Sequence, residues 1–358
     1  MGARDRPRGT PTDRHPAVHV AVVPIVKPSD FKPPESEPAG RSADGTHVRS
    51  RAVLGTAAGA LAISFAPIFV QAIPHGALGP TAIGAYRTLL GAVVLAGIAL
   101  LRRESLRPSR RGLLVTTLAG VLFAGDLFVW HRSIVRVGGG LATILGNTQV
   151  FWTALLGVVL LGERLTARFL LAVPVAIVGI ALATGVLGGE AASKVDPIGV
   201  ALGLGTALFY ASYIHAVRAG RSAVGRMGAV AQMAWTSIAC GVTLTVVALA
   251  EGTLVPPPDA RTALCLVGVA LVAQVFGWVT LATFIPRVPI ALAGLLLLLQ
   301  PAFAVVWEVI FFGRAFTMLQ VAGAMLTLLA IYGGSLARYS PPNEVSGATE
   351  TSDAGPSA

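Results

Sequence analysis

The sequence predicts an all-α polytopic membrane protein with ten transmembrane helices, arranged as an inverted repeat of five plus five. Three observations lead to this fold class. Of the 358 residues, 54% are hydrophobic and only 12% are charged, whereas soluble domains carry about 25% charged residues. The charges stand in short clusters separated by apolar stretches of about 20 residues, the length that crosses a hydrocarbon core. In addition, spaced residues of the first half recur in the second.

The two ends of the chain are predicted to be disordered cytoplasmic tails. Residues 1–50 contain eight prolines among scattered Arg and Ser, a composition that cannot bury enough apolar surface to offset the entropy lost on ordering. Residues 339–358 are rich in small polar residues and Pro. Between the tails we expect two five-helix domains, at 51–188 and 189–338.

Ten apolar segments divide the region between the tails. Their connections are short and rich in Gly, Pro and Arg, so successive helices should be antiparallel. The predicted spans are 52–73, 79–101, 112–131, 138–161, 168–188, 197–217, 227–250, 262–285, 289–312 and 317–337.

Basic residues predict the orientation of these helices, because Lys and Arg resist translocation. If the N-terminus is cytoplasmic, twelve basic residues of the helical region fall inside and five outside. We therefore expect a multi-pass protein of the cell membrane with both termini in the cytoplasm. The net charge of +10 is explained by this topology and by the N-terminal tail, so no nucleic-acid partner is expected.

The internal repeat is visible in residues with conserved spacing between the halves. Three residues recur 151 positions later. They are Gln149, Gly162 and Thr166, matched by Gln300, Gly313 and Thr317. A second set, at an offset of 144, pairs Gly55 and Gly59 of helix one with Gly199 and Gly203 of helix six. Because each half has an odd number of helices, the second half must enter the membrane from the opposite side.

The stretch 143–180, TILGNTQVFWTALLGVVLLGERLTARFLLAVPVAIVGI, resembles the EamA-type members of the drug/metabolite transporter superfamily. In that family the fourth helix ends in a Gly-Glu-Arg-Leu-Thr-like turn, followed by a Gly-rich fifth helix. Ala85-Tyr86-Arg87 in helix two also matches. The resemblance implies a ten-helix carrier, most often an exporter of amino acids or other small metabolites, and in some members a carrier of drugs or nucleotide sugars. One departure is Gly313-Arg314-Ala315 in place of Gly162-Glu163-Arg164, so a role of the acidic turn is not duplicated.

Three charged residues, Arg87, Asp126 and Glu308, lie well inside predicted spans, where a charge needs a cavity or a partner. Arg87 is expected about 12 Å deep and Asp126 about 8–12 Å deep, at 1.5 Å per residue. Their similar depth predicts an ion pair or a joint site for a zwitterionic or charged substrate; a structural pair joining helices two and three is the alternative. Glu308 is either a proton-coupling carboxylate or a helix-end residue. His131 and His215 are expected at the membrane interface.

Four amide side chains are expected near the centre of the bilayer, and two of them are related by the repeat. They are Asn147, Gln149, Gln274 and Gln300. A pair such as Gln149 and Gln300 is what a site on a twofold axis would present. Pro301 also leaves the carbonyl of Leu297 without its helical donor. The alternative is hydrogen bonding between helices, worth about 0.6–2 kcal/mol in membranes.

Aromatic residues at related depths are candidates to line a substrate cavity, with lipid contact or packing as the alternative. They are Phe65, Trp130, Phe209, Tyr210, Tyr213 and Trp278.

The function predicted from these features is secondary transport of small metabolites, such as amino acids or drug-like compounds, by alternating access, with export the expected direction. A channel-like protein or a non-transporting membrane partner subunit is the alternative.

An intramembrane enzyme fits less well, because the chain has no aspartate cluster, no His-Glu-x-x-His motif and no nucleotide-binding Gly-x-x-x-x-Gly-Lys loop. No cofactor or metal is expected. Substrate, energy source and oligomeric state stay open, and a homodimer through the Gly-rich faces is compatible with the sequence.

Overall fold

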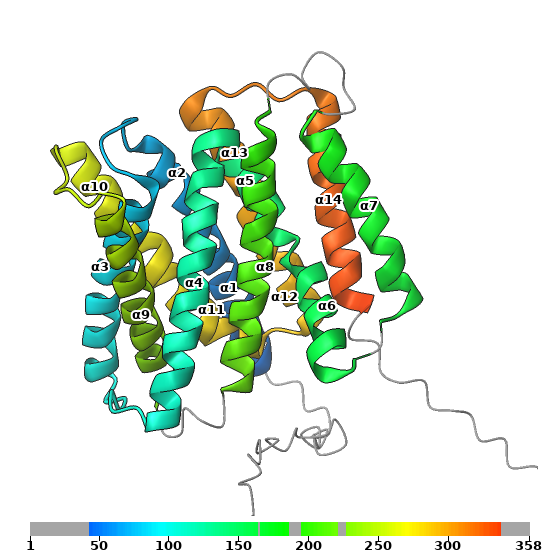
Figure 1. The fold of residues 1–358 in the computed structure, drawn as a ribbon. Coiled ribbons are helices and arrows are strands. Elements are labelled where there is room, and N and C mark those ends of the chain that lie inside the picture. Colours follow the sequence, from blue (N-terminus) through cyan, green and yellow to red (C-terminus); the bar gives the residue numbers. More distant parts are fainter. Residues whose placement is uncertain (1–42, 164, 186–194, 221–226, 338–358) are drawn as a thin grey trace, which may run out of the picture. The chain divides into compact units, whose positions relative to one another are not determined.

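The computed structural model describes residues 43–163, 165–185, 195–220 and 227–337, and these are helical with no strand among them (Figure 1). The all-α fold class is therefore confirmed. Nearly all of both predicted tails lies outside the described residues. The first helix begins at Ala43, earlier than the predicted residue 52.

Nine helical segments of the described chain are long and apolar enough to cross a membrane, and a tenth, Ala167–Ala183, is a shorter apolar helix. Several of the spans are interrupted, so they comprise more than one element. The elements are α1 (Ala43–Ser64), α2 (Ala66–Ala72), α3 (Pro80–Leu101), α4 (Arg110–Val137), α5 (Gly139–Asn147), α6 (Gln149–Leu161), α7 (Ala167–Ala183), α8 (Pro197–Ala219), α9 (Ala229–Ala250), α10 (Ala260–Gly268), the π-helix η3 (Val269–Gly277), α11 (Trp278–Phe284), the 3₁₀-helix η4 (Ile285–Arg287), α12 (Ile290–Leu297), α13 (Leu299–Phe312) and α14 (Met318–Ala337).

The third span is longer than predicted. Helix α4 continues past the predicted end at residue 131 and ends at Val137, because Arg132 and Arg136 pair with carboxylates on other elements. The chain turns at Gly138, whose φ is +88°, a value that residues with a side chain rarely adopt.

The fourth and ninth spans share the same two irregularities. Each is broken near its middle by a short i→i+3 turn: the N–H of Thr148 donates to the carbonyl of Leu145 (3.1 Å), and the N–H of Leu298 donates to that of Leu295 (3.2 Å). Each ends at a left-handed glycine, Gly162 (φ +67°) or Gly313 (φ +62°). The two glycines are 151 positions apart and the two breaks 150 apart, so these irregularities match the repeat to within one residue.

Helix packing follows the same symmetry. Helix two (α3) packs against its counterpart helix seven (α9), and helix five (α7) against its counterpart helix ten (α14). Gly55 of helix one lies against Phe284 of helix eight, while the matching Gly199 of helix six lies against Val137 at the end of helix three. Contacts exchanged between equivalent helices in this way are those of a pseudo-twofold axis that relates the two halves.

The two ends of the helical bundle differ in charge. We call the end that carries the connections 102–109 and 162–166 the arginine-rich end, and the opposite end, with the connections 73–79 and 251–259, the ion-paired end (Figure 1). The ion pairs Arg132–Glu251, Arg136–Asp196 and Arg314–Glu308 lie at the ion-paired end.

Candidate functional site

Arg87, on α3, is the centre of a buried polar cluster. Its side chain is only 3% exposed. Nη2 donates to Oε1 of Gln274 (3.0 Å), and Nη1 lies 3.4 Å from Nε2 of His131. The guanidinium carbon lies 5.8 Å from the ring centroid of Trp130. A buried guanidinium is costly unless its donors are satisfied, and here His131 and Gln274 each engage one terminal nitrogen without neutralising the charge.

Asp126, on α4, shares this region but does not pair directly with Arg87. It is 5% exposed, and Oδ1 has no hydrogen-bond partner among the described residues. None of the ion pairs of the described chain joins it to Arg87, although the two charges interact electrostatically. The expectation of a direct ion pair is therefore not met, because His131 and Gln274 occupy the guanidinium. The expectation of a joint site stays a prediction.

Aromatic side chains from two further helices complete the cluster. The ring centroids of Tyr210 and Tyr213 on α8 are 5.6 Å apart, and Tyr210 lies 6.2 Å from Trp278 of α11. Both tyrosines are near enough to Asp126 to interact with its charge. We call the following set the Arg87–Asp126 cluster: Arg87, Asp126, Trp130, Tyr210, Tyr213, Gln274 and Trp278.

Gln274 reaches Arg87 from the π-helix η3. Its amide also donates from Nε2 to the hydroxyl of Ser237 on α9 (3.3 Å), which links helices two, seven and eight. A π-helical stretch of this length is unusual, and such irregularities occur often at functional sites. Apolar periodicity gives no signal for it, so the π-helix could not be predicted.

His131 is a functional candidate whose place was predicted wrongly. It was expected at the membrane interface, but its side chain is fully buried (0% exposed) because α4 continues for another six residues to Val137. Nδ1 lies 3.0 Å from the carbonyl oxygen of Pro80. His215, the other predicted interfacial histidine, is half-buried, and its Nε2 contacts the carbonyl of Thr153.

The other three amides lie at the helix breaks and not in the Arg87–Asp126 cluster. Asn147 donates to the carbonyl of Thr143 (2.8 Å), and Gln149 accepts from the hydroxyl of Thr153 (3.2 Å), so both make contacts within their own span. Gln300 follows the break at Leu298. The four predicted amides thus separate into two places, and Gln149 and Gln300 flank equivalent interruptions of the fourth and ninth spans.

Two further aromatic candidates lie away from the cluster. Phe65, at the break between α1 and α2, stacks on Trp307 of α13 with centroids 4.7 Å apart. Phe209 lies over Gly125 of α4 and is 37% exposed. Both contacts are packing between helices.

Glu308 lies at the ion-paired end and joins the two halves. Its side chain is buried (1% exposed). Oε1 accepts from Nη1 of Arg314 (2.8 Å), and Oε2 accepts from the backbone N–H of Gly140 (2.8 Å) in the first turn of α5. The same Arg314 atom donates to the carbonyl of Val137 (2.6 Å). With both carboxylate oxygens engaged in this junction, the structural role fits Glu308 better than proton coupling does.

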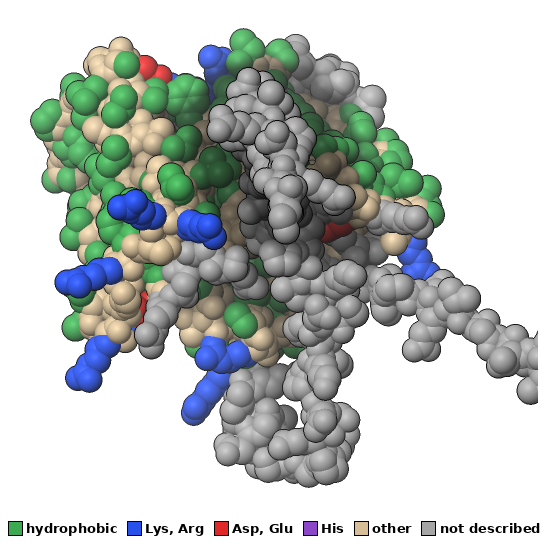
Figure 2. Space-filling view, turned by 60° about the horizontal axis from the view of Figure 1, so that its bottom comes forward, with side chains coloured by type: hydrophobic (Ala, Val, Ile, Leu, Met, Phe, Trp, Pro, Cys, Tyr) green, Lys and Arg blue, Asp and Glu red, His purple; other side chains and the backbone are tan. Residues whose placement is uncertain are grey.

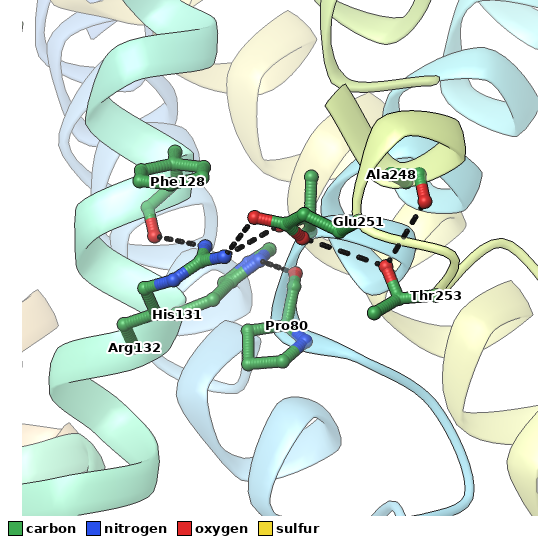
Figure 3. A network of polar contacts seen from close by, with 8 residues as sticks. Pro80, Phe128, His131, Arg132, Ala248, Glu251 and Thr253 are labelled. Atoms are coloured by element: carbon green, nitrogen blue, oxygen red, sulfur yellow. Dashed lines mark hydrogen bonds and ion pairs between the residues drawn. The ribbon is translucent and has the colours of Figure 1, made fainter. Parts of the chain in front are cut away.

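The other two ion pairs also connect the halves. Nη2 of Arg132 on α4 donates to Glu251 (2.6 Å), which follows α9, and to the hydroxyl of Thr81 (2.9 Å). Figure 3 shows Arg132 lying between the ring of Phe128 and Glu251. Arg136 donates to Asp196 (2.5 Å), just before α8. This hydrogen bond holds the pKa of Asp196 below its ordinary value.

A cleft of about 960 Å³ opens at the ion-paired end. Its walls are the connection 73–79, the adjoining ends of α3 and α4, and the Glu308–Arg314 junction. Pro80 and Ile83 contribute from α3, and Ile134 from α4. Most of the lining is apolar.

Metal binding has no support in the described part of the chain, where no group of three His, Cys, Asp or Glu side chains could hold an ion.

Comparison with known proteins addresses the family of this chain. No curated protein matches it. Among solved structures, one titled "Crystal structure of protein" shares 19% identity and a TM-score of 0.56, covering 81% of this chain and 98% of its own. That likeness shows the fold alone. The model of the EamA-like transporter family matches twice, over residues 50–185 and 197–336, once in each half. The chain therefore belongs to the EamA-like transporter family, a family of membrane transporters.

Proposed function

We propose that this protein is a secondary carrier that exports small metabolites, such as amino acids or drug-like compounds, across the cell membrane by alternating access. The observation that carries the proposal is the Arg87–Asp126 cluster. Its members come from α3 and α4 of the first half and from α8, η3 and α11 of the second. A site shared between the halves of an inverted repeat changes its access when the halves rock against each other.

The chemistry of the cluster favours a substrate that is zwitterionic, or one that carries a single charge together with an aromatic ring. Asp126 keeps an oxygen without a partner, and Nε of Arg87 also has none among the described residues. An ammonium group of the substrate could donate to the Asp126 oxygen, and a carboxylate could accept from Nε of Arg87. Such charge-assisted hydrogen bonds are stronger than those between neutral groups. Tyr210, Tyr213 and Trp278 offer faces on which an apolar or cationic group can stack.

The distribution of charge supports a cytoplasmic location for the arginine-rich end. Among the residues whose side chains the structure describes, nine exposed arginines lie there, against two carboxylates, Glu104 and Glu163. Figure 2, turned so that this end comes forward, shows arginine side chains around it. The ion-paired end carries four arginines and four carboxylates in the described chain. Unbalanced positive charge resists translocation, so both termini are cytoplasmic in this proposal.

Purified protein in sealed liposomes provides the test. A panel of amino acids and amphipathic drugs is loaded, with and without a pH gradient, and efflux is followed for the protein, for Asp126→Asn and for Arg87→Gln. We expect saturable flux that both substitutions abolish. Arg261→Gln, at an exposed position outside the cluster, is the matched control and keeps the flux. Flux that never saturates indicates a channel, and no flux for any solute contradicts the proposal.

A further inference from the structure

We infer that His131 is a gating and positioning residue that closes the Arg87–Asp126 cluster to the cleft at the ion-paired end. This inference rests on the proposed function for its meaning, since it assigns the cleft to the transport path. The evidence for it is the position of the His131 imidazole between the cleft and the Arg87–Asp126 cluster.

The order of residues along two antiparallel helices places His131 between the cleft and the cluster. On α3, Pro80 and Ile83 line the cleft, and Arg87 lies one turn deeper than Ile83. On α4, Ile134 lines the cleft, whereas Asp126 lies more than one turn beyond His131 on the deep side.

The imidazole is packed in this layer against side chains of α3 and α9. It lies directly over Gly84 of α3, in a space that it shares with Leu244 of α9, and a Cβ added at Gly84 would meet both side chains. The centroid of its ring is 5.5 Å from that of Trp130. With no exposed surface on His131, the cleft does not continue past it to Arg87.

Two hydrogen bonds hold the ring in place. A carbonyl oxygen can only accept, so Nδ1 carries the hydrogen in the contact with Pro80 (3.0 Å). In the neutral ring Nε2 is then an acceptor, and it faces Nη1 of Arg87 (3.4 Å). His131 therefore orients the guanidinium without adding a second positive charge. Figure 3 shows its ring reaching Pro80 beside the Arg132–Glu251 pair.

Opening of the path toward the cleft requires the imidazole to leave Pro80. The Arg132–Glu251 pair lies at the next residue of α4 and ties that helix to the end of α9. Because Pro80 lies on α3 and His131 on α4, movement of α4 away from α3 separates the two residues.

A thiol already in the chain reports this opening. Cys240, on α9, is fully buried and packs with Ala85 and Trp130 beside Arg87. The other cysteine, Cys265, is replaced by serine. The negatively charged, membrane-impermeant reagent sulfonatoethyl methanethiosulfonate is applied to whole cells or to inverted vesicles that contain the full-length protein, and the rate of Cys240 modification is measured from each side.

We expect His131→Ala to raise this rate about tenfold from one membrane side only, the change that loss of one buried hydrogen bond produces. His131→Leu keeps the volume without the hydrogen bonds; it should show the same rise and carries the test if the alanine variant does not fold. His131→Asn, which retains a donor for Pro80, restores slow labelling.

The matched control is His215→Ala, because His215 also contacts a helix carbonyl, that of Thr153, but lies on α8 away from the cleft. Unchanged labelling in folded His131→Leu, a rise from both sides, or an equal rise in His215→Ala overturns the inference. The labelling needs no substrate, so failure to find transport counts against the proposed function alone.

Discussion

The carboxylate of Glu308 accepts a hydrogen bond from the backbone N–H of Gly140, 2.8 Å away and 168 residues earlier in the chain. The bond joins the end of the ninth span to the beginning of the fourth, which is its counterpart in the repeat. Arg314 completes the junction by pairing with Glu308 and donating to Val137. The two halves are therefore tied together by a buried charge at one end of the bundle.

Removal of this carboxylate should destabilise the protein strongly. Glu308→Ala leaves Arg314 and the N–H of Gly140 without their partner, at a cost of about 3 kcal/mol, the low end of the range for a broken buried pair because Arg314 is partly exposed. Thermal unfolding in detergent measures the effect. The control is Glu251→Ala, whose pair with Arg132 is more exposed and should cost about 1 kcal/mol or less. Equal shifts of the two midpoints would contradict the prediction.

Replacement of both buried charges should separate folding from transport. The double variant Arg87→Met, Asp126→Leu removes two incompletely satisfied polar groups and should unfold at the same temperature or a higher one, because apolar replacement of buried charges is often neutral or stabilising. Liposome flux should be lost. A folded double variant that still transports would remove the Arg87–Asp126 cluster from the mechanism.

The two left-handed glycines should cost similar amounts when they are replaced. Gly162→Ala and Gly313→Ala force a side chain into a left-handed backbone, which costs about 1–2 kcal/mol. Gly333→Ala is the control, because Gly333 lies inside α14 with no atom near the added methyl group and alanine favours a helix by about 1 kcal/mol. Unfolding midpoints should fall for the first two variants and rise for the third. Opposite effects of Gly162→Ala and Gly313→Ala would argue against equivalent turns.

The Arg136–Asp196 pair should make stability sensitive to acid. The hydrogen bond from Arg136, together with that from the N–H of Ile198, lowers the pKa of Asp196 in the folded state. A carboxyl group whose pKa is lowered on folding stabilises the protein at pH values above its ordinary pKa. This stabilisation is lost as the pH falls through the pKa of the folded state. Asp196→Asn should therefore unfold earlier than the parent at neutral pH, with the difference shrinking below about pH 4. A difference that grows in acid would show the wrong sign.

The ten-helix organisation could be predicted because hydrocarbon thickness acts on local sequence. A stretch such as 79–101 must be apolar and of a certain length wherever its neighbours lie, and α3 covers Pro80–Leu101. The repeat also marked the two glycines that end the fourth and ninth spans, although their left-handed conformation is known only from the structure. The end of α4 could not be predicted in this way, because Arg132 and Arg136 remain helical only through distant carboxylates.

Partners within the candidate site were harder to predict than the depths of its residues. Rise per residue places Arg87 and Asp126 at similar depth but does not say which way each side chain points around its helix axis. In the structure Arg87 turns to His131 and Gln274. The position of Gln274 depends on the π-helix, which widens the turns and rotates the residues that follow. Such irregularity reflects tertiary packing, and no periodic pattern in one sequence encodes it.

The Glu308–Arg314 junction at one end of the bundle affects the energetics of the proposed carrier, which is built as an inverted repeat. With perfect symmetry, the state open at one end and the state open at the other would be degenerate, because exchange of the halves converts one into the other. The buried carboxylate of Glu308 and the junction that it makes with Arg314 and Gly140 are not duplicated, because position 157, which corresponds to 308 in the repeat, is a glycine. They lift the degeneracy. In the proposed mechanism the resting population favours closure at the ion-paired end, and a substrate opens that end only through its own difference in affinity for the two states.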